Sequence, residues 1–121
     1  MIARLLVIAG ISLYASSNNP IDLNDAAALD DKYAISANVA CSDSADDYLR
    51  SAVKYDFKWD KIGFFEIKFD RYLTRVSSPG VLTVISNKVA VQNGFGAYEH
   101  IYLYCDYDTQ AWKVLRYWIR E

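Results

Sequence analysis

The feature of this sequence that most limits its fold is an Asn-Gly pair between two stretches of alternating apolar and polar residues. Asn93-Gly94 lies between residues 81–92 and residues 98–107. Asn and Gly both tolerate the positive φ angles of tight hairpin turns, so the pair favours a reversal of the chain at this point. The sequence therefore predicts two antiparallel strands joined by a short turn.

Two further stretches indicate that this hairpin is part of a larger sheet. Residues 64–76 alternate up to Asp70 and then change phase, which predicts a strand with a bulge near Asp70. Ser78-Pro79-Gly80-Val81 has Pro second and Gly third, as in a tight turn, and residues 86–88 mark an irregularity in the strand that follows. Residues 112–119 are rich in aromatic and β-branched residues, which favour strands. We expect four antiparallel strands.

The strand at residues 98–107 divides its side chains between two faces, because successive side chains of a strand point in opposite directions. One face, which we expect to meet the core, holds Ile101, Leu103, Cys105 and Tyr107. The other face holds Tyr98, His100, Tyr102, Tyr104 and Asp106.

A helix is predicted ahead of the strands. In residues 44–58 apolar side chains recur at steps of three and four, and Ser44 with Asp47 has the spacing of a capping box. Residues 18–40 are polar and rich in alanine, so we expect a weakly packed lead-in there, with Asn24 or Asp25 as a cap for one short helical turn. The fold class is α+β: one main helix, first in the chain, packed on a four-stranded antiparallel sheet in a single domain over residues 41–121.

Size and charge exclude several classes of protein. A chain of 121 residues with a net charge of −2 is too short for a second core and lacks the basic surplus of proteins that neutralise nucleic-acid phosphates. One histidine and two cysteines are too few for a zinc site built from those residues, and the sequence has no phosphate-binding loop, dinucleotide motif or nucleophile elbow. We expect neither a metal nor a cofactor.

Residues 1–17 have the three regions of a secretory signal. Arg4 precedes an apolar run over residues 5–15, and the small residues Ala15 and Ser17 predict cleavage after Ser17. The run is shorter than the stretch of about 20 apolar residues that spans a bilayer. The alternative is a buried N-terminal strand or helix. We expect export, so that the protein is periplasmic or secreted and has no stable membrane span.

The only two cysteines, Cys41 and Cys105, predict one disulfide in an oxidising compartment. A helix laid across the sheet would bring them together, because Cys41 precedes residues 44–58 and Cys105 lies on the inner face of its strand. The alternatives are two free buried thiols in a cytosolic protein, or a reactive thiol, although neither cysteine has a neighbouring histidine.

A longer pattern accompanies these cysteines. Cys41, an amphipathic helix, a strand, the run Gln92-Asn93-Gly94-Phe95-Gly96-Ala97, a second strand and Cys105 follow one another in the sequence. This order resembles a loose group of small exported proteins of bacteria and their prophages, over residues 41–119. Residues 59–65 depart from that group, which more often has a Pro-Ser or Pro-Asp turn there. The resemblance implies export, a disulfide and this fold, but no established activity.

Two parts of the predicted sheet are candidate binding surfaces. At the turn, Asn93, Gly94 and Gly96 supply the backbone shape, while Phe95 either packs down over the end of the core or acts as the anchor of a binding loop. On the outward strand face, Tyr98, Tyr102 and Tyr104 lie beside His100, with Trp112 or Trp118 alongside; either residues 18–40 cover them or they form a protein interface.

The sequence offers little to an enzyme. His100 has no Ser or Cys at the spacing of a known motif, and Asp106 with Asp108 would hold a hydrated cation only weakly. We therefore expect a non-enzymatic exported domain that binds another protein, as an inhibitor, an immunity protein or an exclusion factor, and no nucleic-acid partner. The alternatives are a structural part of an envelope or virion assembly, and a small hydrolase or nuclease that uses His100.

Overall fold

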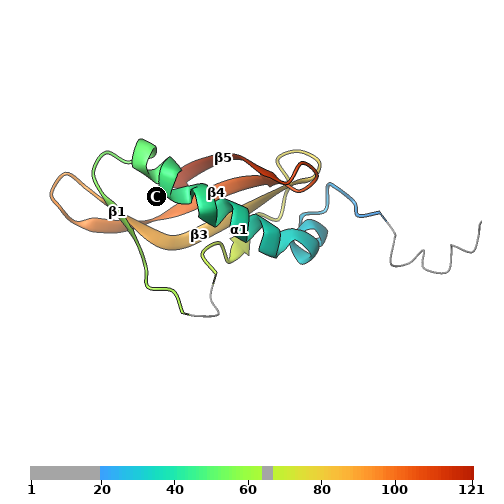
Figure 1. Ribbon diagram of the computed structural model, residues 1–121, viewed down its shortest axis with the longest axis horizontal. Helices are drawn as coiled ribbons and strands as arrows, with labels where there is room; N and C mark the ends of the chain where they lie inside the picture. Colours follow the sequence, from blue (N-terminus) through green and yellow to red (C-terminus); the bar gives the residue numbers. More distant parts are fainter. Residues whose placement is uncertain (1–19, 64–66) are drawn as a thin grey trace, which may run out of the picture.

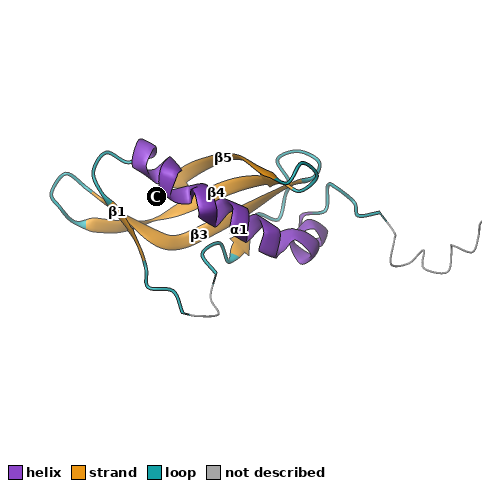
Figure 2. Cartoon of the chain, in the orientation of Figure 1, coloured by secondary structure: helices purple, strands orange, loops and turns teal. Residues whose placement is uncertain are grey.

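The computed structural model describes residues 20–63 and 67–121, so the predicted signal at residues 1–17 lies outside the described part. The described chain forms one helix and an antiparallel sheet of five strands: α1 (Ala26–Ala52), β1 (Phe57–Trp59), β2 (Arg71–Tyr72), β3 (Val81–Gln92), β4 (Tyr98–Asp108) and β5 (Lys113–Arg120). The helix lies across one face of the sheet (Figure 1; Figure 2). The predicted α+β fold is confirmed, with five strands where we expected four.

The two short strands share one edge of the sheet. The strand order is β1-β3-β4-β5, and β2 also pairs with β3. In β3, residues 84–85 pair with β2 and residues 89–91 pair with β1. The pairing of β3 with β4 shifts register between Ser86 and Val89, which confirms the irregularity expected at residues 86–88. The edge is therefore built in two pieces, one on each side of the shift.

The helix is longer than predicted, because it begins at Ala26 rather than at residue 44. Asp25 is its N-cap, and the Asp25 carboxylate accepts a hydrogen bond of 3.2 Å from the backbone N–H of Ala28. The expected lead-in is thus the first half of α1 from Ala26 onward, and Ser44 lies inside the helix instead of capping it. The buried residues of the helix are mostly small, so the amphipathic pattern of the helix is weak. They are Ala26, Leu29, Ala37, Cys41, Ala45 and Leu49.

The C-terminal boundary of the predicted helix was also wrong. The helix ends at Ala52, and Val53 takes an extended conformation while its N–H still donates to the carbonyl of Leu49 at 3.0 Å. Residues 57–59 then form strand β1. In β1 the indole N–H of Trp59 donates to the carboxylate of Asp46 at 2.7 Å, which ties this edge strand to the helix.

The strand predicted at residues 64–76 is confined to Arg71–Tyr72, and residues 64–66 lie outside the described part. Phe69 is buried, but its backbone N–H donates to the side-chain oxygen of Asn38 in α1 at 3.0 Å instead of to a neighbouring strand. Ile67, two positions earlier in the alternating pattern, is 41% exposed, so the described part of this pattern does not form a strand with one buried face.

The predicted turn before β3 is confirmed. The N–H of Val81 donates to the carbonyl of Ser78 at 3.0 Å, and Gly80 has a φ of +82°, a conformation that favours glycine. The N–H of Gly80 also donates to the carbonyl of Leu23 at 2.8 Å. The segment that leads into the helix is thus fastened to the beginning of β3.

The predicted disulfide is confirmed. Cys41 in the middle of α1 and Cys105 in β4 are bonded, with a Cα–Cα distance of 6.2 Å and a sequence separation of 64, and both residues are fully buried. Around them the inner faces of β3 and β4 pack against the helix through a cluster of buried side chains that includes Leu29, Leu49, Leu82, Val84, Val89, Ile101, Leu103 and Tyr107. The four residues expected on the inner face of β4 are all buried.

No helix in residues 20–63 and 67–121 combines the length and the apolar character needed to cross a membrane.

Candidate binding face of the sheet

The face of the sheet opposite α1, which we call the outer face, carries the predicted tyrosines. Its β4 residues alternate with the buried inner set, and Tyr102 is 41% exposed while Tyr104 is half-buried. We considered residues 18–40 as a cover for these tyrosines. From Ala26 onward these residues instead form the helix on the other face (Figure 1), so they do not cover them.

A row of stacked side chains crosses the outer face from β4 to β5. Tyr104 and Trp118 are cross-strand partners, and their rings stack with centroids 5.0 Å apart and planes at 13°. The guanidinium carbon of Arg116 lies 4.3 Å from the centroid of the Trp118 ring, and that of Arg120 lies 5.7 Å from the centroid of the Tyr104 ring. We call these four residues the arginine–aromatic ladder. Each ring thus makes one cation–π contact with a guanidinium group and one stacking contact with the other ring.

Sequence reasoning found the tyrosine of this ladder and considered Trp118, but missed both arginines. Arg116, Trp118 and Arg120 are two positions apart in a strand, so they share one face. That alternation was the signal available in the sequence.

A hollow of about 280 Å³ opens beside the ladder, where the segment after β2 meets the outer face. We call it the arginine hollow; it is lined by Leu73, Arg75, Val76, Ser77, Thr83, Arg116 and Trp118. The side chain of Asp106 next to it is 4% exposed, and its carboxylate accepts hydrogen bonds from the hydroxyl of Thr83, from the hydroxyl of Ser77 at 3.3 Å and from the Nε–H of Arg116 at 2.9 Å. A buried carboxylate is costly unless it is paired in this way.

The carboxylates of Asp106 and Asp108, which we considered as weak cation ligands, have other partners. Asp106 is bonded to Arg116 and to two hydroxyls, whereas the carboxylate of Asp108 accepts from the backbone N–H groups of Gln110 and Ala111 at 3.0 and 3.1 Å. Asp108 therefore stabilises the turn between β4 and β5. Among the described residues, no group of three or more His, Cys, Asp or Glu side chains could hold a metal ion.

His100 has an acidic partner that sequence reasoning missed. Its Nε2 lies 2.7 Å from a carboxylate oxygen of Asp60, and both side chains are about half exposed. Asp60 follows β1 and is 40 positions away in the sequence, so it became a neighbour only through the pairing of β1 with β3. In the described part of the chain, no hydroxyl or thiol is hydrogen-bonded to His100, and the pair lacks the nucleophile that a Ser- or Cys-based hydrolase needs.

Tyr98, at the other end of the face, is held in place by charged neighbours. Its hydroxyl donates to the carboxylate of Asp56 at 2.7 Å, and the ammonium of Lys58 lies 4.2 Å from the centroid of its ring. This hydrogen bond lowers the pKa of Asp56 and raises the pKa of Tyr98. Tyr98 thus belongs to a contact with the segment around β1 rather than to the ladder.

The hairpin tip presents Phe95 to solvent, because Phe95 is 98% exposed. The expectation that it packs over the end of the core was wrong. The side-chain oxygen of Asn93 accepts from the N–H groups of Phe95 and Ala97 at 2.9 and 3.1 Å, and Gly96 has a φ of +88°. Neither Asn93 nor Gly94 has the positive φ that we expected; Gly94 instead lies against Tyr55, where a Cβ would be 3.3 Å from the tyrosine hydroxyl.

Trp112 does not belong to the tyrosine face. It is 66% exposed in the turn between β4 and β5, has a φ of +59°, and contacts the ring edge of Tyr33 in α1, with centroids 6.2 Å apart at 88°. The turn thus directs Trp112 toward the helix, and Trp118 takes the place beside Tyr104.

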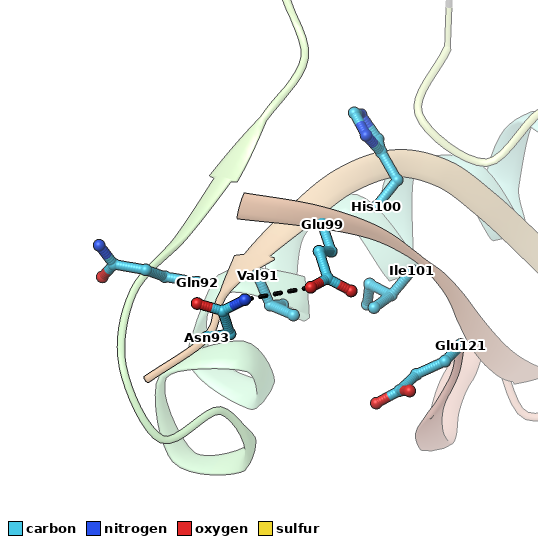
Figure 3. Close-up of a pocket in the computed structure, with 7 residues that line it drawn as sticks. All are labelled: Val91, Gln92, Asn93, Glu99, His100, Ile101 and Glu121. Atoms are coloured by element: carbon cyan, nitrogen blue, oxygen red, sulfur yellow. Dashed lines mark hydrogen bonds between the residues drawn. The ribbon is translucent and has the colours of Figure 1, made fainter. Parts of the chain in front are cut away.

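A second hollow, of about 320 Å³, lies at the hairpin end of the sheet (Figure 3). Val91 and Ile101 contribute apolar side chains, Glu99 and Glu121 contribute carboxylates, and Asn93 donates to Glu99 at 3.1 Å. Figure 3 shows the side chain of His100 pointing away from that of Glu99, so the histidine lines this hollow mainly with its backbone.

Comparison of the chain with protein-family models, curated proteins and solved structures finds no match.

Proposed function

We propose that this chain is an exported, non-enzymatic domain that binds another protein through the outer face of its sheet, at the cell envelope or outside the cell, as an inhibitor, an immunity protein or an exclusion factor. The observation that carries the proposal is the arginine–aromatic ladder, which stands on a face that α1 does not cover. Tyr, Trp and Arg are the residues that contribute most often to the energetic centres of protein interfaces.

The pre-arranged side chains support binding rather than catalysis. Stacking fixes the rings of Tyr104 and Trp118, and the bond to Asp106 fixes the guanidinium of Arg116, so a partner would lose little side-chain freedom on these residues. The buried disulfide and the signal-like residues 1–17 support export, because disulfides persist in oxidising compartments. The His100–Asp60 pair favours a hydrolase or nuclease, but no nucleophile among residues 20–63 and 67–121 is hydrogen-bonded to it.

The experiment compares capture of a partner by the full chain and by variants, after chemical crosslinking in a secreting host. Tyr102→Ser removes an exposed ring from the outer face, and Tyr55→Ser removes one of similar exposure elsewhere. We expect Tyr102→Ser to reduce recovery of the crosslinked partner about tenfold, as for a moderate interface residue. Tyr55→Ser should leave recovery unchanged.

Equal recovery with the two variants would contradict the proposal. Thermal unfolding of both variants checks that each is folded. A structural role in a larger assembly predicts a complex that persists in size-exclusion chromatography, whereas an inhibitor or immunity protein forms a pair that dissociates on dilution.

A further inference from the structure

The arginine hollow has apolar walls and a polar floor. Leu73, Val76 and Trp118 supply apolar surface, while Ser77 and Thr83 point their hydroxyls at the buried Asp106. Both hydroxyl protons are used in these hydrogen bonds. A ligand in the hollow would therefore be recognised by the walls and by the two arginines, not by the hydroxyl donors.

The two arginines differ in what they already bind. Arg116 gives its Nε–H to Asp106, and its side chain is 61% exposed, so its terminal amino groups face outward with no hydrogen bond to the described residues. Arg75 is exposed and makes no ion pair or hydrogen bond with the described residues. Two guanidinium groups and one buried carboxylate leave a single net positive charge at the hollow.

We propose that the arginine hollow binds one carboxylate side chain, an Asp or Glu of the partner protein, with a neighbouring apolar side chain against Leu73, Val76 and Trp118. This inference rests on the proposed function, because it names the chemistry of the partner at the same face. A carboxylate matches the parallel N–H donors of a guanidinium, and here Asp106 and the Trp118 ring hold one guanidinium in position before binding.

The charge of the hollow favours one carboxylate over a nucleic acid. The hollow has one net positive charge, which a single acidic side chain neutralises, whereas the chain as a whole has a net charge of −2. Nearby, Asp60 lies beside His100, and Asp70 is paired with Arg71 at 3.6 Å and with Lys88 at 3.4 Å. A nucleic-acid strand needs a longer run of cations to neutralise its successive phosphates.

The test uses the full exported chain with its disulfide formed, followed by nuclear magnetic resonance. The probes are two capped peptides, acetyl-Phe-Glu-Leu-amide and acetyl-Phe-Gln-Leu-amide, and a short oligothymidylate. The signals are the indole N–H of Trp118 and the backbone N–H groups of Ser77 and Thr83. We expect the Glu peptide to shift these signals saturably and to bind about tenfold more tightly than the Gln peptide, the factor of one charge-assisted hydrogen bond.

Arg75→Gln is the variant of choice, because Arg116→Gln would leave the buried Asp106 without its cation. Arg75→Gln should weaken binding of the Glu peptide about tenfold and leave the affinity for the Gln peptide unchanged. Arg50→Gln, which alters an exposed arginine of α1, is the matched control and should change neither.

Three results would overturn the inference: equal affinity for the two peptides, no saturable shift with the Glu peptide, or tighter binding of the oligothymidylate that Arg75→Gln abolishes.

The capture experiment separates failure of the carboxylate inference from failure of the proposed function. Capture that depends on Tyr102 but not on Arg75 refutes the carboxylate inference and keeps the proposed function. Binding of the Glu peptide without any captured protein refutes the proposed function and keeps the hollow as a carboxylate site.

Discussion

At the scale of single residues, Tyr117 connects the sheet to the helix through hydrogen bonds and ring stacking. Its hydroxyl donates to the carbonyl of Cys41 at 2.6 Å and lies 2.6 Å from the hydroxyl of Ser44, and its ring stacks on Tyr48 with centroids 5.0 Å apart. Burial raises the pKa of Tyr117 above its ordinary value of 10.0; Asp43 and Asp47 raise it further, and the bond with Ser44 opposes them. The folded state therefore favours the neutral phenol.

This raised pKa predicts a loss of stability in alkali. Because the pKa is higher in the folded than in the unfolded chain, the contribution of Tyr117 is fully present below about pH 10 and is lost as the pH rises through the folded value. Urea unfolding at pH 9 and pH 11 should show a larger fall in the free energy of unfolding for the natural chain than for Tyr117→Phe. Tyr98 and Tyr107, whose pKa values are also raised, titrate in both proteins. An equal fall in both would contradict this role of Tyr117.

At the scale of elements, the beginning of α1 depends on one side chain. The carboxylate of Asp25 satisfies an N–H group that has no partner within the helix. Asp25→Ala should lower the free energy of unfolding by about 1 kcal/mol, measured in urea. Asp31→Ala, which removes an exposed carboxylate six positions further along the chain, should change the free energy of unfolding by less than about 0.5 kcal/mol. If the two variants lose the same free energy of unfolding, the Asp25 cap does not stabilise the beginning of α1.

The elements also show what alternation and periodicity can predict. β3, β4 and β5 were found from sequence because turn residues separate them and their aromatic and β-branched residues favour strands. Buried side chains alternate along much of β4, whereas residues 81–86 of β3 are buried on both faces. The first half of α1 was missed because its buried side chains are mainly alanine, which local hydrophobicity barely distinguishes from a solvated segment. β1 was missed because three residues carry too little pattern, and its pairing depends on β3 some thirty positions later.

The same limit applies to the candidate site. Which β4 residues lie on the outer face follows from alternation, and Cys41–Cys105 follows from the count of cysteines. The arginine hollow does not follow from the sequence. Thr83 reaches Asp106 through the pairing of β3 with β4, but Ser77 is 29 positions from Asp106, and only the path of the chain after β2 brings it there.

At the scale of the whole molecule, the disulfide is the contact with the largest expected effect on stability. It closes a loop between positions separated by 64 residues, and in the chain-entropy model such a closure stabilises the fold by about 4 kcal/mol. The double variant Cys41→Ser, Cys105→Ser should lower the free energy of unfolding in urea by roughly that amount. This is a large share of the total free energy of unfolding of a domain, which is typically about 5–15 kcal/mol. The reduced natural chain is the control, because it loses the bond but keeps the sulfur atoms. A loss below about 1 kcal/mol in both would contradict a stabilising role for the bond.

The position of this bond also decides what a single cut of the chain does. Cys41 lies within α1 and Cys105 within β4, so the turn before β3, the hairpin tip and the arginine hollow's segment from Leu73 to Ser77 all fall between them. A protease that cleaves once anywhere in that interval leaves two pieces joined by a covalent bond. The two pieces of such a nicked molecule stay joined until a reductant reaches the buried sulfurs. In an oxidising compartment such as the one proposed above, one proteolytic event would therefore not separate the helix from the sheet.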